Sequence, residues 1–481
     1  MKKWLLRASA AACAAAGLAA CAAAGLAACA VGPDYRKPEA AALPERLPSA
    51  VAAADQGLRE GLPQALWWRE FGDVRLETLV QQAWQGNYDL RIALARVQVA
   101  SEQANVARAA RWPGANLEGA ASHARLNAGE SPDGVARIAN PVQSALVFGW
   151  ELDLFGRVRR GVEAAQASQE EREAWREDMR RLILAQVVES YLELRGAQML
   201  ELCLQAQIDN EQQTFGLIRE RVAAGRAARA EQLRYEAQLS LLAARLPLYR
   251  AQTRAARNRL ATLSGLRLDA APLAALDQPQ AWRLPDSLLL DAPAALLGRR
   301  PDVRAAERAL AAATARVGVA KANRFPRVSL AALLGGSGVA GEWLGGEASR
   351  WRAGGALSWP LFDGGALAAS QRAAAADVTA AVAGFDKAVA IALEESDTAI
   401  ANWTQLRQRA RQLQGAQELS AESARLARIR YREGTESLLG VLEAERTALA
   451  AQEQLLSASR DLALATARSY VAVAGGFDQG H

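Results

Sequence analysis

Histidine and cysteine are the residues whose side chains could carry reactive chemistry in this sequence, and both are scarce. The 481 residues include two histidines, His123 and His481, and four cysteines. Two histidines exclude most zinc sites and most acid–base catalysis by imidazole. Gly336, Gly338 and Gly341 match the Gly-x-Gly-x-x-Gly pattern of dinucleotide sites. No amphipathic helix follows them to bind a phosphate, so we expect a loop there. The sequence therefore predicts no enzyme, no cofactor and no metal site.

Three of the cysteines lie in an uncharged, alanine-rich segment that follows a short basic start, a layout typical of a secretory signal peptide. Leu-Ala-Ala-Cys ends at Cys21 and again at Cys29, and this box is similar to the site at which bacterial lipoproteins are cleaved and acylated on the thiol. We favour Cys29 over Cys21 because ordinary mature sequence begins at Val31. Accidental cysteines in an alanine repeat are the alternative. We expect residues 1–28 to be a lipoprotein signal peptide and the proline-rich residues 29–65 to be an acylated tether.

Charge and composition narrow the class of protein further. Hydrophobic residues make up 51% of the chain and aromatic residues only 6%. The formal net charge is +5, and three of the basic residues behind it lie in the leader. This balance is too weak to indicate a nucleic-acid partner. If Cys29 is acylated, Cys203 has no partner for an intrachain disulfide, and we expect it to be a packing residue.

The two halves of the chain repeat the same order of landmarks. Residues 88–120 align with 301–333 without a gap. The paired residues are Asp89 with Asp302, Arg111 with Arg324, Pro113 with Pro326, Trp150 with Trp359 and Gly225 with Gly434. Such self-similarity indicates a tandem duplication. We therefore divide the chain into a first repeat at 66–265, a linker at 266–292, a second repeat at 293–476 and a tail at 477–481.

Each half predicts a helix that ends at Arg-aromatic-Pro, a strand, a glycine-rich loop, a second strand, a very long helix, a glycine-centred turn and a returning helix. The second strands, 142–154 and 351–361, alternate apolar with polar or small residues, as in a transmembrane β-barrel with a wet lumen. A soluble sandwich would alternate in the same way. Four aromatic residues at one end of the sheet favour the barrel, because barrels carry such a girdle at the membrane interface. These residues are Trp112, Phe155, Phe325 and Phe362. Four strands cannot close a barrel, whereas three chains would supply twelve.

The long helices set a length. They run between the glycines of 156–225 and of 364–434, and at 1.5 Å per residue each spans roughly 100 Å. Apolar and small residues from Val378 to Leu413 follow heptad spacing, which permits close packing of many helices. A two-stranded coiled coil is the alternative. We favour a β-barrel joined to a tube of helices.

Six stretches follow one another, over nearly the whole mature chain, in the order found in one known family. They are residues 29–38, 67–73, 87–91, 150–156, 296–307 and 360–365. The most specific is Leu-Leu-Gly-Arg-Arg-Pro-Asp-Val-Arg-Ala-Ala-Glu at 296–307. The chain resembles the TolC-like outer-membrane efflux channels, specifically their lipoprotein branch, the OprM/NodT-like factors.

The resemblance implies an α+β membrane protein. Three chains would form a homotrimer with a twelve-stranded outer-membrane β-barrel, continuous with a twelve-helix periplasmic α-barrel. It implies a lipid-anchored channel in the outer membrane that extends into the periplasm. The channel would passively conduct substrates delivered by an inner-membrane efflux transporter, of the resistance-nodulation-division type, and a periplasmic adaptor. A lipid-anchored periplasmic coiled-coil scaffold without a pore is the alternative function. The sequence does not identify the transported substrate, because the inner-membrane pump would largely determine which substrates are selected.

The resemblance also implies which residues form the tip and the gate. In the family, the two helical turns furthest from the membrane meet the adaptor. Here these turns contain Gly225 and the pair Gly434 and Thr435, and a glycine suits them because the helix must stop through a left-handed backbone. The candidates for the closed constriction are Glu231, Tyr431, Glu436 and Glu443.

Two positions depart from the family pattern. Gly440 stands where a relative has a second acidic residue, and Glu436 stands where it has an arginine. A threefold ring of carboxylates would attract cations and would resist closing unless partners or protons neutralise it. The alternative is that Glu231 and Glu443 are ordinary solvated helix positions.

Overall fold

The structure is a computed structural model that describes residues 30–38, 44–52, 57–61, 66–129, 135–285, 287–339 and 348–473. Cys21, Cys29, the signal peptide and the tail at 477–481 lie outside these residues. The chain divides into two compact units. The sheet unit contains the described parts of residues 1–39, 96–173 and 305–386. The helical unit contains those of residues 40–95, 174–304 and 387–481.

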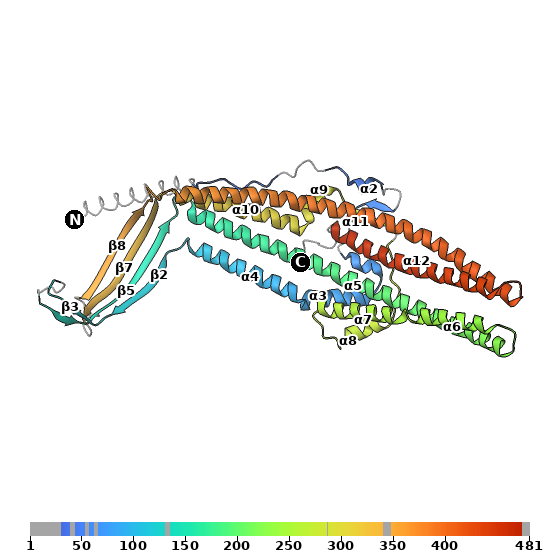
Figure 1. Cartoon of the computed structure of the whole chain (residues 1–481). Coiled ribbons are helices and arrows are strands. Elements are labelled where there is room, and N and C mark those ends of the chain that lie inside the picture. Colours follow the sequence, from blue (N-terminus) through green and yellow to red (C-terminus); the bar gives the residue numbers. More distant parts are fainter. Residues whose placement is uncertain are drawn as a thin grey trace. The chain divides into compact units, whose positions relative to one another are not determined.

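The sheet unit is built around four antiparallel strands (Figure 1). They are β2 (Gly114–Ala121), β5 (Pro141–Leu152), β7 (Arg327–Val339) and β8 (Ser349–Ser358), in the order β2-β5-β7-β8. Each half of the chain supplies two of them, as the alternation predicted. The halves meet where β5 pairs with β7, with Trp150 opposite Leu330. Within the described residues, β2 and β8 each have one neighbour, which leaves two sheet edges open.

Large apolar side chains are exposed on this sheet. Leu117 is 80% exposed, Trp351 79% and Leu357 68%. Apolar surface of this kind marks a face that meets lipid or another protein surface. Gly336 and Gly338, expected in a loop, lie within β7, because β5 extends far enough to pair with both. Gly341 lies outside the described residues.

A hydrogen bond from a tryptophan marks the end of the second strand in each half. The indole nitrogen Nε1 of Trp150 donates to the carbonyl of Arg111 at 3.0 Å, and that of Trp359 donates to the carbonyl of Arg324 at 3.1 Å. Each arginine precedes an aromatic residue and a proline, which ends the preceding helix because proline cannot donate a backbone hydrogen bond. The repeat seen in the sequence thus recurs in three dimensions.

The second strand of each half is followed by a very long helix, and the two helices have equal length. They are α5 (Arg157–Ala223) and α11 (Ala366–Arg432), each of 67 residues, which corresponds to a rise of about 100 Å. Asp153 caps α5 by accepting hydrogen bonds from the backbone nitrogens of Val158 and Arg159 at 2.9 and 2.8 Å. Asp363 caps α11 in the same way through the backbone nitrogen of Leu367 at 2.6 Å. The two predicted long helices are therefore present.

The returning helices differ between the halves. The second half returns as α12 (Leu438–Ala472), whereas the first returns as α6 (Arg229–Ala243) followed by α7 (Leu246–Leu263). The prediction of one continuous returning helix in the first half was wrong. Pro247 causes the break, because its ring conflicts with the carbonyl four residues earlier, at Ala243.

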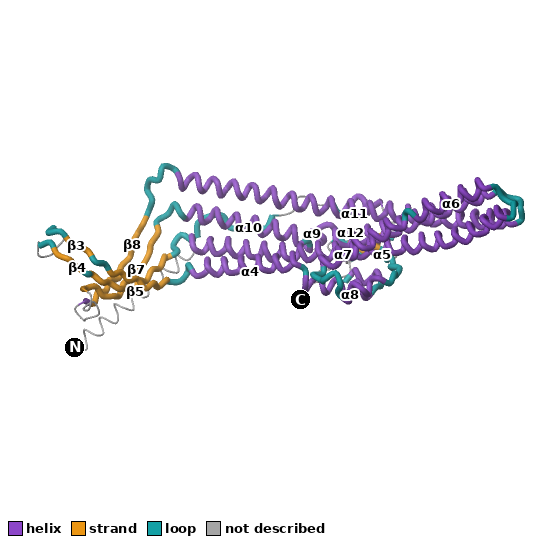
Figure 2. Tube along the Cα trace, turned by 60° about the horizontal axis from the view of Figure 1, so that its bottom comes forward, coloured by secondary structure: helices purple, strands orange, loops and turns teal. Residues whose placement is uncertain are grey.

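Shorter elements complete the described chain. The helices are α2 (Pro48–Ala52), η2 (Trp67–Phe71), α3 (Val74–Gly86), α4 (Tyr88–Ala109), α8 (Ala271–Ala274), η3 (Ala275–Asp277), α9 (Pro293–Arg299) and α10 (Pro301–Ala322). The strands are β1 (Leu58–Glu60), β3 (Ala124–Leu126), β4 (Arg137–Ala139) and β6 (Leu288–Leu290). Figure 2 shows β3 and β4 as a small hairpin beside the ends of the main strands.

One of these pairs joins the predicted tether (29–65) to the predicted linker (266–292). β1 of the tether pairs in parallel with β6 of the linker, because Leu288 and Leu290 bury their side chains there. Among the described residues, no helix combines the length and the apolarity that a membrane span requires.

The core of the helical unit explains two of the motifs. Trp67 stacks on Tyr470 with ring centroids 5.2 Å apart, so the tryptophan pair of η2 is a packing element. Arg300, only 1% exposed, forms ion pairs of 2.6 Å with Asp302 and with Glu395. Its Nη1 also donates to the carbonyl of Ala472 at 3.3 Å, at the end of α12. The Arg-Arg-Pro-Asp motif therefore holds the C-terminus of that helix.

Candidate functional site

Two tight turns end the long helices within the helical unit (Figure 1). The first tip turn, residues 224–228, joins α5 to α6, and the second tip turn, residues 433–437, joins α11 to α12. Gly225 has φ +68° and Gly434 has φ +77°, the left-handed values that other residues avoid. The nitrogens of Arg226 and Thr435 then close the helix ends by bonding carbonyls five residues earlier, at 2.8 and 2.9 Å.

The two hairpins pack against each other behind these turns. Their shared apolar cluster contains Ile218, Tyr235, Leu438 and Leu442, with Phe215, Val222 and Tyr431 packed against it. Arg221 of α5 donates a hydrogen bond to the hydroxyl of Tyr431 of α11 at 2.5 Å. The tip therefore joins both halves of the chain.

The structure places the four gate candidates around this junction. Glu231 is half-buried in the first turn of α6, Tyr431 is half-buried at the end of α11, and Glu443 is exposed on α12. Glu436 is half-buried in the second tip turn. Among the described residues, no hydrogen bond or ion pair connects the three carboxylates to one another. Tyr431 is the candidate that the fold brings into a polar contact, with Arg221.

The two departures from the family pattern contact each other. The carboxylate of Glu436 accepts a hydrogen bond from the backbone nitrogen of Ser437 at 3.0 Å and lies over Gly440. A side chain on residue 440 would collide with Oε1 of Glu436. Glycine at one position therefore accommodates the carboxylate at the other.

A polar cluster of three buried residues and one exposed arginine lies behind the turns, and the four helices of the tip each contribute one residue to it. The residues are Glu211 of α5, Tyr235 of α6, Arg428 of α11 and Glu445 of α12. Tyr235 donates its hydroxyl hydrogen to Oε2 of Glu211. Nε of Arg428 lies 2.8 Å from Oε1 of Glu445. The side chains of Glu211 and Glu445 are within hydrogen-bonding reach of each other.

Burial shifts the protonation of this cluster. Burial, together with the negative charge of Glu211, raises the pKa of Glu445 to about 7, although Arg428 opposes the shift. Burial and the neighbouring Glu211 carboxylate also raise the pKa of Tyr235. Glu445 is therefore a carboxyl group that titrates near neutral pH.

Sequence reasoning missed Glu445, although a signal was present. Leu438, Val441 and Leu442 form the buried face of α12, and Glu445 continues their helical spacing on that face. An acidic residue in an apolar stripe must find a partner inside the protein. The resemblance to the family points instead to Glu443, which is exposed two residues earlier on the same helix.

The first hairpin exposes an excess of arginines near its turn. Arg219, Arg226, Arg229 and Arg234 are all exposed, and none forms an ion pair within the described residues. Glu220 and Glu236 are the exposed acidic residues of the same stretch. The first hairpin is therefore basic near its turn.

The four aromatic residues predicted at the membrane interface lie where helices and strands meet in the sheet unit. Phe155 and Phe325 stack on each other with centroids 4.8 Å apart, which joins the two halves. Trp112 and Phe362 are separately exposed, at 75% and 92%.

The segment that follows Cys29 binds along the sheet unit. The backbone nitrogen of Val31 donates to the carbonyl of Phe155 at 3.1 Å, and Gly32, with φ +115°, packs against Gly318. Asp34 forms an ion pair of 2.5 Å with the buried Arg160. The start of this segment therefore lies beside the stacked phenylalanines.

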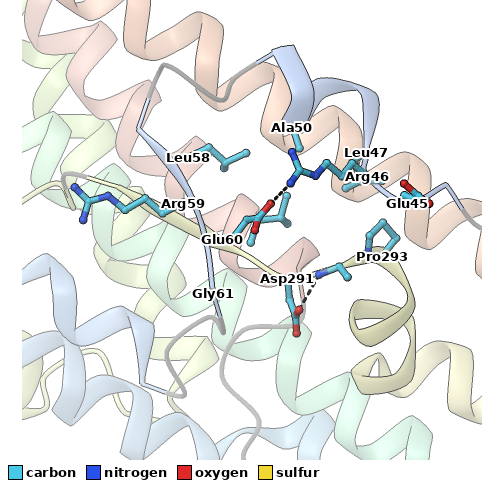
Figure 3. Close-up of a pocket in the computed structure, with 12 residues that line it drawn as sticks. Glu45, Arg46, Leu47, Ala50, Leu58, Arg59, Glu60, Gly61, Asp291 and Pro293 are labelled. Atoms are coloured by element: carbon cyan, nitrogen blue, oxygen red, sulfur yellow. Dashed lines mark hydrogen bonds and ion pairs between the residues drawn. The ribbon is translucent and has the colours of Figure 1, made fainter.

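The concave surface in Figure 3 is a cavity of about 390 Å³ in the helical unit, beside β1 and β6. Arg46 and Glu60 pair at 2.5 Å in it, and Asp291 accepts a hydrogen bond from the backbone nitrogen of Ala292 at 2.7 Å. Arg46 and Glu60 therefore neutralise each other, and Asp291 also forms an ion pair of 2.8 Å with Arg299. Elsewhere in the described residues, no group of three or more potential ligands could hold a metal ion. Cys203 is a half-buried free thiol in α5.

The sequence and the fold match known proteins over most of their length. The family described as outer membrane efflux protein matches residues 79–266 and 292–474, one stretch in each half. The chain is 29% identical to nodulation protein T of Rhizobium leguminosarum bv. trifolii over 451 residues, covering 93% of this chain and 94% of that protein. It is 30% identical to the solvent efflux pump outer membrane protein SrpC of Pseudomonas putida over 452 residues, covering 92% and 95%.

A solved structure shows the same fold. The structure of the outer-membrane channel OprN superimposes with a TM-score of 0.85 at 36% identity, covering 93% of this chain and 99% of that one. Its match confirms the combination of long helices and strands, and the two matched stretches support the internal repeat.

Proposed function

Because this chain belongs to the family of outer membrane efflux proteins, we propose that it is the passive outer-membrane duct of a tripartite efflux pump. The family is one of outer-membrane channels, so the protein is a channel component and not an enzyme. The energy for transport would come from an inner-membrane transporter of the resistance-nodulation-division type. A periplasmic adaptor would connect the two.

The observation that carries this proposal is the four-stranded sheet with apolar side chains exposed and both edges open. Three chains would join such edges into a twelve-stranded barrel, and twelve helices would continue it as a tube. The exposed leucines and tryptophans would then face lipid. A coiled-coil scaffold would have no use for this sheet.

The tip turns are the proposed surface for the adaptor. Gly225, Gly434 and Thr435 lie in turns that expose backbone and small side chains. The arginines of the first hairpin would complement an acidic partner surface, since charge complementarity accelerates and orients docking.

The gate is proposed at the same end. Glu231, Glu436 and Glu443 would form rings of carboxylates around the threefold axis, and Tyr431 would hold the hairpins closed through Arg221. Such rings attract cations, and the carboxylates within a ring repel one another when the chains approach the axis. Opening would therefore separate the hairpins of each chain.

The lipid anchor is proposed at Cys29. The covalently adjacent Ala30 lies against Gly156, beside Phe155 and the start of α5. An acyl chain on Cys29 would then enter the membrane at the level of the aromatic residues Trp112, Phe155, Phe325 and Phe362, without a long spacer. The position of Ala30 supports Cys29 rather than Cys21 as the acylated residue.

We also propose that the mature chain divides into a first repeat (66–265), a linker (266–292) and a second repeat (293–476). The ranges of the two family matches, 79–266 and 292–474, support it.

Single-channel recording in planar bilayers tests the duct. Purified acylated protein, shown to be trimeric, should give discrete cation-preferring openings, small in the wild type and larger in Glu443→Ala. Equal small openings in both would keep the duct and remove Glu443 from the gate. No openings in either protein would favour the scaffold.

A further inference from the structure

We propose that Glu211 and Glu445 form a proton-dependent latch between the two hairpins of the tip. One shared proton holds the hairpins together, and its loss drives them apart. The inference rests on the proposed function, because it assigns a regulation to the gate of the duct.

The hydrogen bonds of the cluster leave room for one proton. Oε1 of Glu445 is occupied by Arg428 at 2.8 Å, whereas its buried Oε2 has no donor among the described residues. Glu211 lies against it, and Oε2 of Glu211 already accepts from Tyr235. A proton on either carboxyl group supplies the missing donor and joins the two residues by a hydrogen bond.

Without that proton, two negative charges remain in a buried site. Glu211 is 6% exposed and Glu445 4% exposed, so water screens their repulsion poorly. The groups that face the pair are Tyr235 from α6, which is neutral, and Arg428 from α11. The Arg428 side chain is 47% exposed, and one cation cannot neutralise two carboxylates. The raised pKa of Glu445, about 7, agrees with this geometry.

Because of the position of the pair, the repulsion between the two carboxylates pushes the two hairpins apart. Glu211 belongs to the first hairpin and Glu445 to the second, so the force acts across the packed surface between them. The same surface carries the apolar cluster around Ile218 and Leu442 and the contact of Arg221 with Tyr431. Separation of the hairpins would carry the gate candidate Glu443, two residues from Glu445, away from its closed position.

The direction of the pH effect follows from proton linkage. In the closed tip, Glu445 keeps its proton up to about pH 7, whereas in an opened, hydrated tip it would titrate near its ordinary value of 4.5. The ratio of open to closed tips therefore rises about tenfold per pH unit between these values and levels off above them.

The test is the open probability of the reconstituted trimer at pH 5.5 and pH 7.5. The wild-type ratio of open to closed channels should rise by about tenfold or more. Glu445→Gln should stay near the acidic value at both pH values, because its amide nitrogen donates permanently to Glu211. Glu211→Gln should do the same from the other side, which provides a second variant if one misfolds. The matched control Glu236→Gln removes an exposed carboxylate of α6 and should keep the wild-type slope.

Hydrogen exchange in detergent provides a readout that needs no pore. After correction for intrinsic rates, the helices around residues 205–222 and 438–450 should be better protected at pH 5.5 than at pH 7.5 in the wild type, and equally protected in Glu445→Gln. A pH slope that survives in Glu445→Gln, in openings or in exchange, would overturn the latch. Normal exchange behaviour without any openings would instead count against the duct.

Discussion

The indole nitrogen of Trp359 donates a hydrogen bond to the carbonyl of Arg324 at 3.1 Å, and this bond ties the end of β8 to the end of α10. Trp150 and Arg111 make the same bond in the first half. The same hydrogen bond therefore occurs at the helix-to-strand connection of each repeat. The bond fixes the end of each second strand next to the segment in which the aromatic residues lie.

Removal of this bond should weaken the sheet unit modestly. Trp359→Phe keeps an aromatic ring but loses the donor, and we expect a loss of at most about 1 kcal/mol, because the residue is half exposed. Thermal unfolding in detergent measures it. Trp351→Phe is the control, since Trp351 is 79% exposed and donates to no described residue. Equal midpoints for the two variants would contradict a structural role for the bond.

A side chain at Gly434 should destabilise the second tip turn. Its φ of +77° is left-handed and the space around it is empty, so Gly434→Ala should cost about 1–2 kcal/mol by backbone strain alone. Gly415 lies within α11 in equally open space, and Gly415→Ala should stabilise by roughly 0.5–1 kcal/mol. Unfolding midpoints that shift in the same direction would refute the argument.

Gly440 and Glu436 should be energetically coupled. Gly440→Ala adds helix propensity to α12 but displaces the Glu436 carboxylate from the nitrogen of Ser437. In a Glu436→Ala background no carboxylate needs to move, so the same substitution should stabilise more. A double-mutant cycle on unfolding free energies measures the difference. Strict additivity would show that the two residues do not meet.

Arg300 should be among the most sensitive positions of the helical unit. Arg300→Ala leaves Asp302 and the carbonyl of Ala472 without this partner, at an expected cost of about 3–5 kcal/mol. Arg267→Ala, which breaks an exposed pair, should leave the free energy of unfolding nearly unchanged. Comparable effects of the two substitutions on unfolding would be inconsistent with the buried network.

The same network predicts a loss of stability in acid. Burial alone would raise the pKa of Asp302, but the hydrogen bond and charge of Arg300 outweigh it and lower the pKa below its usual value of 3.8. The contribution of Asp302 is therefore complete above that value and disappears as the pH falls through the lowered one. Asp302→Asn should flatten this part of the acid unfolding curve.

Acylation should occur on Cys29. Mass spectrometry of the mature N-terminal peptide should find a lipid on Cys29. Cys29→Ser should abolish it, whereas Cys21→Ser should leave it in place. A mature chain that begins with an acylated Cys21 would overturn the assignment of the anchor to Cys29.

The sequence alone determined the repeat, the four strands of the sheet, the two long helices and the glycines at which they end. These features depend on local signals: alternation with a period of two, proline and glycine stops, and an alignment of one half on the other. Proline also explains the failure at residues 244–245, where Pro247 divides a helix that the repeat predicted to be continuous.

Only the tertiary structure decided which polar residues meet. Glu211 and Glu445 lie 234 positions apart in the chain, and Glu445 differs from its exposed neighbour Glu443 only in the face of α12 that it occupies. Likewise, the contact between Glu436 and Gly440 depends on the path of one turn. Local patterns specify backbone conformation, but burial, and with it the protonation of a carboxyl group, depends on which helices pack against it.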